Sequence, residues 1–244
     1  MKALLQWLWL CLLAALGLQL FFLLRVLAMG WVAPESTSFE RSQIWQIVQR
    51  EHRLPWRQEW APLSAISKNL QRAVLASEDD VFATHGGIRW DAVENAWNKN
   101  AKAQARAEKQ ASQRPGKTTP AAKVVGGSTI TQQLAKNLFL SGERNLVRKG
   151  QEMLITLMLE TCLSKQRILE IYLNSVEWGE GVFGAQAAAQ HYFRKPASQL
   201  SAWEAARLAV MLPRPRYFEK LPNSPYLAER SDVIAGRLTS VVLP

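Results

Sequence analysis

Apolar and polar residues recur with a helical period over most of this chain, after one long apolar run at its start. Residues 3–24 contain no charged side chain and consist almost entirely of Leu, Ala, Trp and Phe. A helix of these twenty-two residues would be about 33 Å long, enough to cross the roughly 30 Å hydrocarbon core of a bilayer. The run therefore predicts an N-terminal transmembrane helix.

A cleaved signal peptide is the alternative for this run. The run is longer than the usual apolar part of a signal peptide, only Lys2 precedes it, and no small-x-small cleavage site follows Arg25. Charge does not decide the orientation, because Lys2 and the amino terminus on one side face Arg25 and Arg41 on the other. We expect an uncleaved anchor over residues 1–30 and one domain over 31–244.

The domain itself is predicted to be mainly helical. After a short linker at 34–37, the segment 39–50 is helical in pattern and would either lie near the membrane or pack against the domain. Apolar residues at three- and four-residue spacing predict further helices at 63–78, 129–140, 144–163, 165–173, 182–191 and 201–211. No stretch alternates long enough to predict a strand.

The overall charge favours an anionic partner. Thirty Lys and Arg against twenty Asp and Glu give a net charge of +10, which suits nucleic acid, a membrane surface or a phosphorylated substrate. The 244 residues, 48% of them hydrophobic, allow one substantial core but not two large domains. Cys11 and Cys162 lie far apart, without the local motif of a disulfide framework, zinc site or nucleophile.

Residues 98–125 have a different composition, with seven basic residues, one acidic residue and no aromatic residue. Such a segment cannot bury enough apolar surface to join a core, so we predict an exposed, mobile insertion. Its GKT at 116–118 is not a phosphate loop, because Ala111 stands where the motif needs glycine and Pro115 lies inside it.

The polar cluster EDDVFATHGG at 78–87 follows the predicted helix 63–78. Glu78, Asp79 and Asp80 are adjacent. Carboxylates that are crowded in this way raise one another's pKa, which suits a general base. The alternative for Glu78 is an ordinary solvated helix end. His85 is more consistent with a hydrogen-bonded structural residue than with a catalyst.

Arg144, Arg148 and Glu152 are spaced four residues apart and share one stripe of their helix, with Lys149 beside them. A carboxylate within a row of cations could shape a diphosphate site, or Arg148 and Glu152 could be a plain surface pair. Upstream, GGSTITQQLAKN at 126–137 combines glycines, helix-capping residues and Lys136, which favours an anion near a helix start. The residues alone leave these alternatives open.

These strings together resemble the signature of glycosyltransferase family 51, the peptidoglycan glycosyltransferases. EDDVFATHGG at 78–87, GGSTITQQLAKN at 126–137, RKGQE at 148–152 and KQRILEIYLN at 165–174 occur in the family's order, and 181–200 is also similar. The likeness covers about residues 40–215 and is greatest to the monofunctional, membrane-anchored biosynthetic members. It implies a lysozyme-like helical glycosyltransferase domain with a small membrane-proximal lobe, behind one transmembrane helix.

The resemblance also implies a reaction, in which the growing glycan chain passes from undecaprenyl diphosphate to the 4-hydroxyl of lipid II with inversion, forming a β-1,4 bond. Glu78 matches the general base, and Glu152 matches a second essential glutamate that organises the diphosphate, with or without Mg²⁺ or Mn²⁺. No organic cofactor is expected. The matching cations are Lys136, Arg144, Arg148 and Lys149, the residues expected to line the cleft are Ser128, Thr129, Gln132 and Gln133, and Asn174 is expected to support its shape.

Further expectations follow from what the chain lacks and where it departs from the family. SxxK and KTG are absent, which leaves no transpeptidase. Gln151 stands where some relatives have a basic residue. We expect a single-pass protein of the cytoplasmic membrane with its domain on the periplasmic side, in contact with lipid II, glycan and other wall-synthesis or division proteins. The alternatives are a non-catalytic scaffold, a lytic enzyme and, last, a nucleic-acid-binding protein.

Overall fold

A computed structural model describes residues 2–51, 55–91, 94–95, 98, 101–103, 105, 127–140, 142–143 and 145–244. Arg144 and most of the predicted basic insertion at 98–125 lie outside the described residues.

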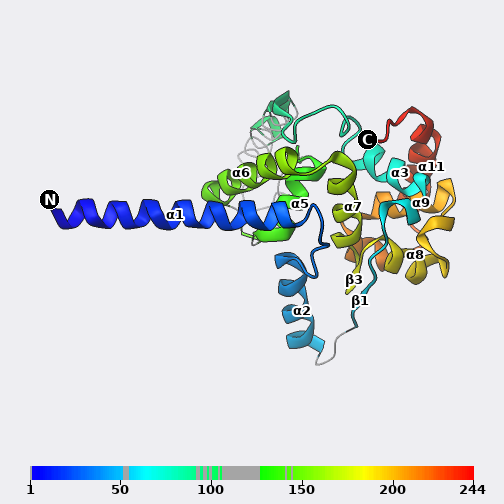
Figure 1. Cartoon of the computed structure of the whole chain (residues 1–244). Coiled ribbons are helices and arrows are strands. Elements are labelled where there is room, and N and C mark those ends of the chain that lie inside the picture. Colours follow the sequence, from blue (N-terminus) through cyan, green and yellow to red (C-terminus); the bar gives the residue numbers. More distant parts are fainter. Residues whose placement is uncertain are drawn as a thin grey trace, which may run out of the picture.

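The predicted N-terminal helix is α1, Lys2–Ala28, and it projects far beyond the rest of the chain (Figure 1). Most of its apolar side chains are exposed, and only Phe22 and Val26 are buried. Its C-terminal half lies along α6, Leu146–Cys162. Within the described part of the chain, α1 is the one helix long and apolar enough to cross a membrane.

The remainder is mainly helical, as predicted. The helices are α2 (Ser38–Glu51), α3 (Lys68–Glu78), α5 (Ile130–Phe139), α6, α7 (Lys165–Ser175), α8 (Ala185–Phe193), α9 (Ala202–Met211), α10 (Pro215–Glu219) and α11 (Pro225–Arg237), with short 3₁₀ turns at Leu63–Ala65, Ala197–Gln199 and Leu238–Ser240. Side-chain caps begin several of them, because a Ser or Thr oxygen there accepts an otherwise unpaired backbone N–H. Ser67, Thr129, Ser164 and Ser201 do so.

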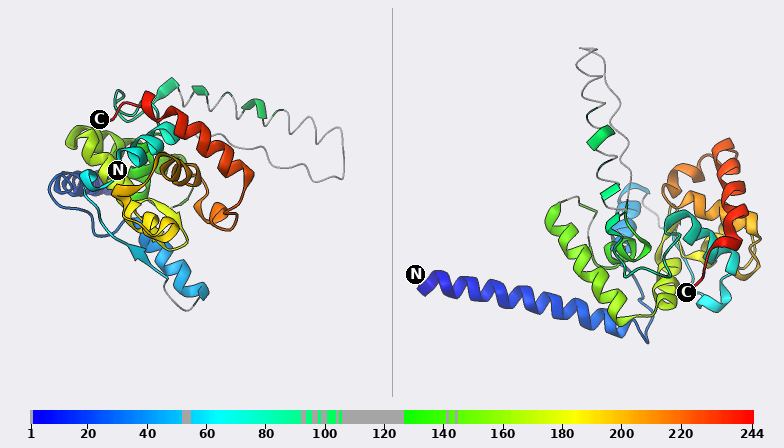
Figure 2. Two further views of the ribbon diagram at one scale, coloured as in Figure 1. Left: turned by 90° about the vertical axis from the view of Figure 1, so that its right-hand side faces the viewer. Right: turned by 90° about the horizontal axis from the view of Figure 1, so that it is seen from above.

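Two groups of helices share one continuous apolar core. In one group α9 packs against both α3 and α11, and in the other α5 packs against α6, α7 and α2. Figure 2 shows α1 leaving on the side opposite α11. The helix α3 ends beside the start of α5, which brings the first and second sequence motifs together.

A small sheet, which the sequence did not predict, joins the helices. Its strand order is β1–β3–β2, from Arg57–Gln58, Val182–Phe183 and Glu177–Gly179, with β1 parallel and β2 antiparallel to β3. The helix predicted over 182–191 was therefore wrong at its start, since α8 begins at Ala185. Gly184 separates the two elements with φ of 83°, and a Cβ there would lie 2.8 Å from the Asn174 carbonyl oxygen.

Candidate active site

Glu78 is the last residue of α3, and its side chain is half-buried. Gln133 Nε2 of α5 donates a 2.9 Å hydrogen bond to Glu78 Oε2. Burial raises the pKa of Glu78, the Gln133 hydrogen bond opposes that shift, and the charge of Asp79 adds a smaller increase. The crowding of carboxylates that the sequence suggested is thus the minor cause, and removal from water is the major one.

Asp79 connects the end of α3 to the start of α5. Asp79 is 4% exposed, and its carboxylate accepts hydrogen bonds from the Ile130 backbone N–H at 3.1 Å and from His85 Nε2 at 2.9 Å. His85 Nδ1 in turn accepts from the Gly87 N–H at 3.0 Å, which assigns the proton of a neutral ring to Nε2. His85 is therefore hydrogen-bonded within the structure, as predicted, and Asp79 holds the two motifs in register.

Gly87 lets the same turn approach α6 closely. Its φ is 86°, and a Cβ would lie 2.6 Å from Glu160 Cγ and 2.8 Å from Thr156 Cγ2. The Gly87 carbonyl accepts a hydrogen bond from the Thr129 hydroxyl. A side chain at this position would push the turn, and with it the start of α5, away from α6.

Gln133 is oriented by a second residue, Tyr172 of α7. The buried Tyr172 hydroxyl donates a 3.0 Å hydrogen bond to Gln133 Oε1, which directs the Gln133 amide N–H₂ toward Glu78. Burial, followed by the charge of Glu78, raises the pKa of Tyr172 well above its ordinary value, so the hydroxyl stays protonated and can donate. Sequence reasoning did not identify Tyr172, although it lies within the motif KQRILEIYLN.

A groove of about 660 Å³ lies one helical turn along α5 from Gln133. Its charged lining comes from α5, α6 and the segment before α6, and consists of Lys136, Glu143, Arg148, Lys149 and Glu152. Cations outnumber carboxylates there, so the groove suits an anion. Glu78 does not line it, but Gln133 and Lys136 are three residues apart on α5 and therefore share a face.

Glu152 is 3% exposed and is paired with cations of its own helix. Arg148 Nη1 donates to its Oε2 at 2.7 Å, and Lys149 Nζ donates to its Oε1. The i,i+4 pair considered from the sequence is thus present, but it is buried at the groove rather than exposed on the surface. Arg148 Nε is buried and has no hydrogen-bond partner among the described residues, which leaves a donor beside the groove.

The other predicted cleft residues divide into two sets. Ser128 is exposed and lines the groove. Thr129 and Gln132 are buried and form the capping box of α5, so they shape the helix start from inside the protein. Asn174 accepts from the Ala61 N–H and donates to the Ala61 carbonyl, both at 2.8 Å, which supports the chain next to the sheet.

Gln151 does not face the groove. Its amide exchanges hydrogen bonds of 2.8 and 2.9 Å with the amide of Gln19 in α1. Gln151 is therefore used here to contact the N-terminal helix.

Sequence reasoning missed one wall of the groove, which is α2. Its residues Phe39, Ser42, Gln43 and Gln46 line the groove together with Ser38. Their spacing of three and four residues places them on one helix face, and the polar residues among them were a usable signal. The segment 39–50 was predicted either to lie near the membrane or to pack against the domain. Ile47 is buried in the domain, whereas Trp45 is 65% exposed.

Comparison with known proteins identifies the family. The sequence model of the transglycosylase family matches residues 46–239. This chain belongs to the transglycosylase family. The match includes both glutamates, both ends of α5 and the α6 cations, whereas most of the α2 wall of the groove precedes it.

Individual relatives share most of the length of this transglycosylase. A biosynthetic peptidoglycan transglycosylase of Burkholderia thailandensis is 52% identical over 231 residues, covering 95% of this chain and 84% of the relative. Proteins of the same name from Burkholderia orbicola and Burkholderia pseudomallei are each 50% identical over 95% of this chain, covering 87% and 84% of those relatives. The similarity thus includes the N-terminal region as well as the catalytic domain.

Proposed function

We propose that this chain is a peptidoglycan glycosyltransferase that polymerises glycan strands for the cell wall. The donor is the growing chain on undecaprenyl diphosphate, and the acceptor is lipid II, whose 4-hydroxyl attacks the anomeric carbon with inversion to give a β-1,4 bond. Family membership and the names of the relatives support the reaction class. The observation that carries the proposal is the shared face of α5, which joins a carboxylate of raised pKa to a cationic groove.

Glu78 is the proposed base. Gln133 is its one hydrogen-bond donor among the described residues, and it uses Oε2, so Oε1 is left to accept the proton of the acceptor hydroxyl. As that proton moves to Glu78, the acceptor oxygen forms its bond to the anomeric carbon. A raised pKa makes the carboxylate a stronger base once it is ionised, which favours this transfer.

The groove is the proposed site of the leaving diphosphate. When the bond from the anomeric carbon to oxygen breaks, the electron pair stays on the diphosphate, and Lys136, Arg148 and Lys149 stabilise the added charge. Glu152 holds Arg148 and Lys149 in position through its ion pairs. The N–H groups of Arg148 and Lys149 that do not contact Glu152 are then already oriented when the substrate binds.

A divalent cation remains a prediction. The described residues include no group of three His, Cys, Asp or Glu side chains suited to hold a metal ion. Glu152 directs each of its oxygens at a cation. Because this donor set does not fit a protein-held metal, we derive no step through one.

Membrane anchoring is part of the same proposal. With 27 residues, α1 is about 40 Å long and long enough to span a bilayer. Both substrates carry lipid tails, so an anchor beside the groove keeps the enzyme where they are. We place the domain on the periplasmic side of the cytoplasmic membrane, where other wall-synthesis and division proteins are candidate partners. A compartment-sensitive reporter fused to the C-terminus tests this orientation, and a cytoplasmic signal contradicts it.

Polymerisation of purified lipid II tests the chemistry. We expect Glu78→Gln to lower the rate by roughly 10²- to 10⁴-fold, the usual contribution of a general base, and Glu152→Gln to cause a comparable loss. The matched control is Asp80→Asn, which changes an exposed neighbour of Glu78 and should retain activity. Wild-type rates in Glu78→Gln would remove the base assignment. Release of fragments from finished peptidoglycan would instead favour a lytic enzyme.

A further inference from the structure

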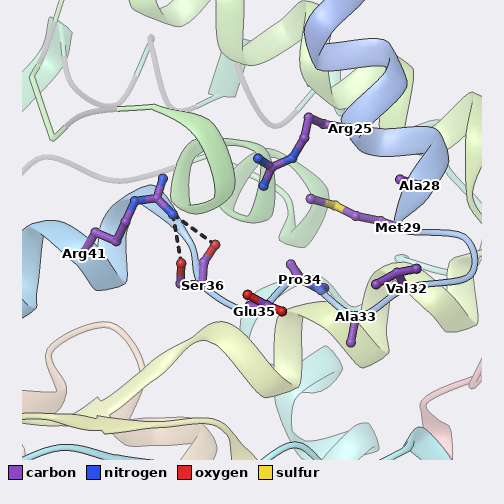
Figure 3. Close-up of a pocket in the computed structure, with 9 residues that line it drawn as sticks. All are labelled: Arg25, Ala28, Met29, Val32, Ala33, Pro34, Glu35, Ser36 and Arg41. Carbon is purple, nitrogen blue, oxygen red and sulfur yellow. Dashed lines mark hydrogen bonds between the residues drawn. The ribbon is translucent and has the colours of Figure 1, made fainter.

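A second pocket, of about 360 Å³, lies where α1 ends and the chain turns toward α2. Figure 3 shows the Arg25 guanidinium of α1 and the Arg41 guanidinium of α2 directed into the same hollow. The floor is apolar and is formed by Ala28, Met29, Val32, Ala33 and Pro34, while Glu35 and Ser36 complete the lining. No residue of this pocket lines the diphosphate groove, so the two are distinct.

Arg41 is held ready for an anion. Its Nη1 donates to the Ser36 carbonyl at 3.2 Å and to the Ser36 hydroxyl at 3.0 Å, and its Nη2 donates to the Ser38 hydroxyl at 3.1 Å. These neutral acceptors orient the guanidinium without forming an ion pair with it. No salt bridge within 4 Å is found for Arg25 or Arg41 among the described residues. Arg25 lies 5.9 Å from the centre of the Phe21 ring, and Arg41 interacts electrostatically with the neighbouring buried Glu40.

The pocket also lies at the depth of lipid headgroups if α1 spans the membrane. Arg25 is the first charged residue after the uncharged run 3–24, whose length of about 33 Å matches the hydrocarbon core. Trp31 and Val32 follow it and are 84% and 64% exposed, and exposed Trp is typical of the boundary between bilayer and water. An occupant of the pocket would therefore have its acyl chains beside the exposed apolar face of α1.

We propose that this pocket binds the headgroup of an amine-bearing phospholipid, with the phosphodiester between Arg25 and Arg41. This inference rests on the proposed membrane anchoring. Glu35 selects the headgroup, because its carboxylate can form an ion pair with an ethanolamine ammonium, which the neutral glycerol of phosphatidylglycerol cannot provide. The preferred ligand is therefore phosphatidylethanolamine rather than phosphatidylglycerol. The bound phosphate joins α1 to α2, and another face of α2 forms a wall of the diphosphate groove.

Native mass spectrometry of the full-length protein in detergent micelles tests the site by titration with phosphatidylethanolamine or phosphatidylglycerol. We expect the wild type to retain phosphatidylethanolamine at lower lipid concentration. Arg25→Gln should weaken that binding about tenfold, since a charge-assisted hydrogen bond is lost. Arg230→Gln, at an exposed position on α11, is the matched control and should change nothing. Glu35→Gln should bring the affinities for the two lipids close together.

Further measurements separate the possible failures. Soluble phosphoethanolamine should not compete at lipid-level concentrations, and competition would indicate a site for a free phosphate. Undecaprenyl diphosphate should not displace the phospholipid, and displacement that depends on Arg25 would assign the pocket to the substrate. Unchanged lipid binding in Arg25→Gln, or equal affinity of the wild type for both lipids, overturns the inference. Lipid II polymerisation in the same micelles should persist in Arg25→Gln, whereas an inactive wild type would contradict the proposed function itself.

Discussion

The amide pair between Gln19 of α1 and Gln151 of α6 should contribute measurably to the docking of the anchor. Each side chain donates to the other, at 2.8 and 2.9 Å, and both are partly buried. Interhelical hydrogen bonds in membranes contribute about 0.6 kcal/mol on average and up to about 1.7 kcal/mol. Two such bonds give an expected coupling energy of about 1–2 kcal/mol between Gln19 and Gln151.

A double-mutant cycle measures this coupling. Gln19→Leu and Gln151→Leu each leave the partner amide without its hydrogen bonds in apolar surroundings, so each single variant should lose stability. The double variant should lose less than the sum of the two, because leucines can pack against each other. Unfolding of the full-length chain in mixed micelles, titrated with a denaturing detergent and followed by Trp fluorescence, gives the free energies.

The control for the cycle is Leu16→Ala, a change at a 57% exposed position of α1. Paired with Gln151→Leu, it should show no coupling. A Gln19–Gln151 coupling energy within about 0.3 kcal/mol of zero, the usual scatter for independent sites, would refute the reasoning. The anchor would then be held by apolar contacts alone, such as the edge-to-face pair of Phe22 with Phe139, whose ring centroids are 5.3 Å apart.

Three further outcomes are expected. Gln133→Leu removes the hydrogen bond that lowers the pKa of Glu78, so the acid limb of the pH–rate profile for polymerisation should move to higher pH; an unmoved limb would argue against Glu78 as the base. Because burial raises the pKa of Glu78, the stability that its protonated form provides is present at low pH and lost as pH rises through the raised value. The melting temperature of Glu78→Gln should therefore exceed that of the wild type at about pH 8, and the difference should shrink toward about pH 4, where the ordinary carboxyl group is protonated. Gly87→Ala should lose about 1–3 kcal/mol of unfolding free energy, because the φ of Gly87 is 86° and the new Cβ would meet Glu160. Gly86→Ala is the control and should behave as the wild type, since a Cβ there meets nothing within 4 Å. Equal stabilities of the two variants would contradict the packing argument.

The sequence predicted helices well where a cap and an apolar period agree. Thr129 begins α5 and Ser201 begins α9, each with a complete capping box, and both helices were predicted within a residue or two of their observed bounds. The strands could not be found in this way, because two or three residues are too few to show alternation. All residues of β2 and β3 are buried, so no polar face marks them.

The site was predictable in its residue types but not in its connections. The acidic and cationic motifs were evident, yet the relay from Tyr172 through Gln133 to Glu78 depends on the packing of α7 against α5. Thr129 caps α5 from inside the protein, and Gln151 contacts α1. Both roles likewise depend on how each helix is rotated about its axis. Those rotations are set by the apolar core and cannot be read from local spacing.

One contact at the base of the anchor limits where the enzyme can work. Arg167 of α7 donates from Nε to the carbonyl oxygen of Met29 at 2.7 Å, immediately after α1 ends. Together with the packing of α1 against α6, this hydrogen bond leaves no free tether between α1 and the domain, and the groove is kept at one position relative to α1. With α1 in the membrane, as proposed, such an enzyme could not move outward to distant wall material, and it would reach new sites by lateral diffusion in the plane of the membrane.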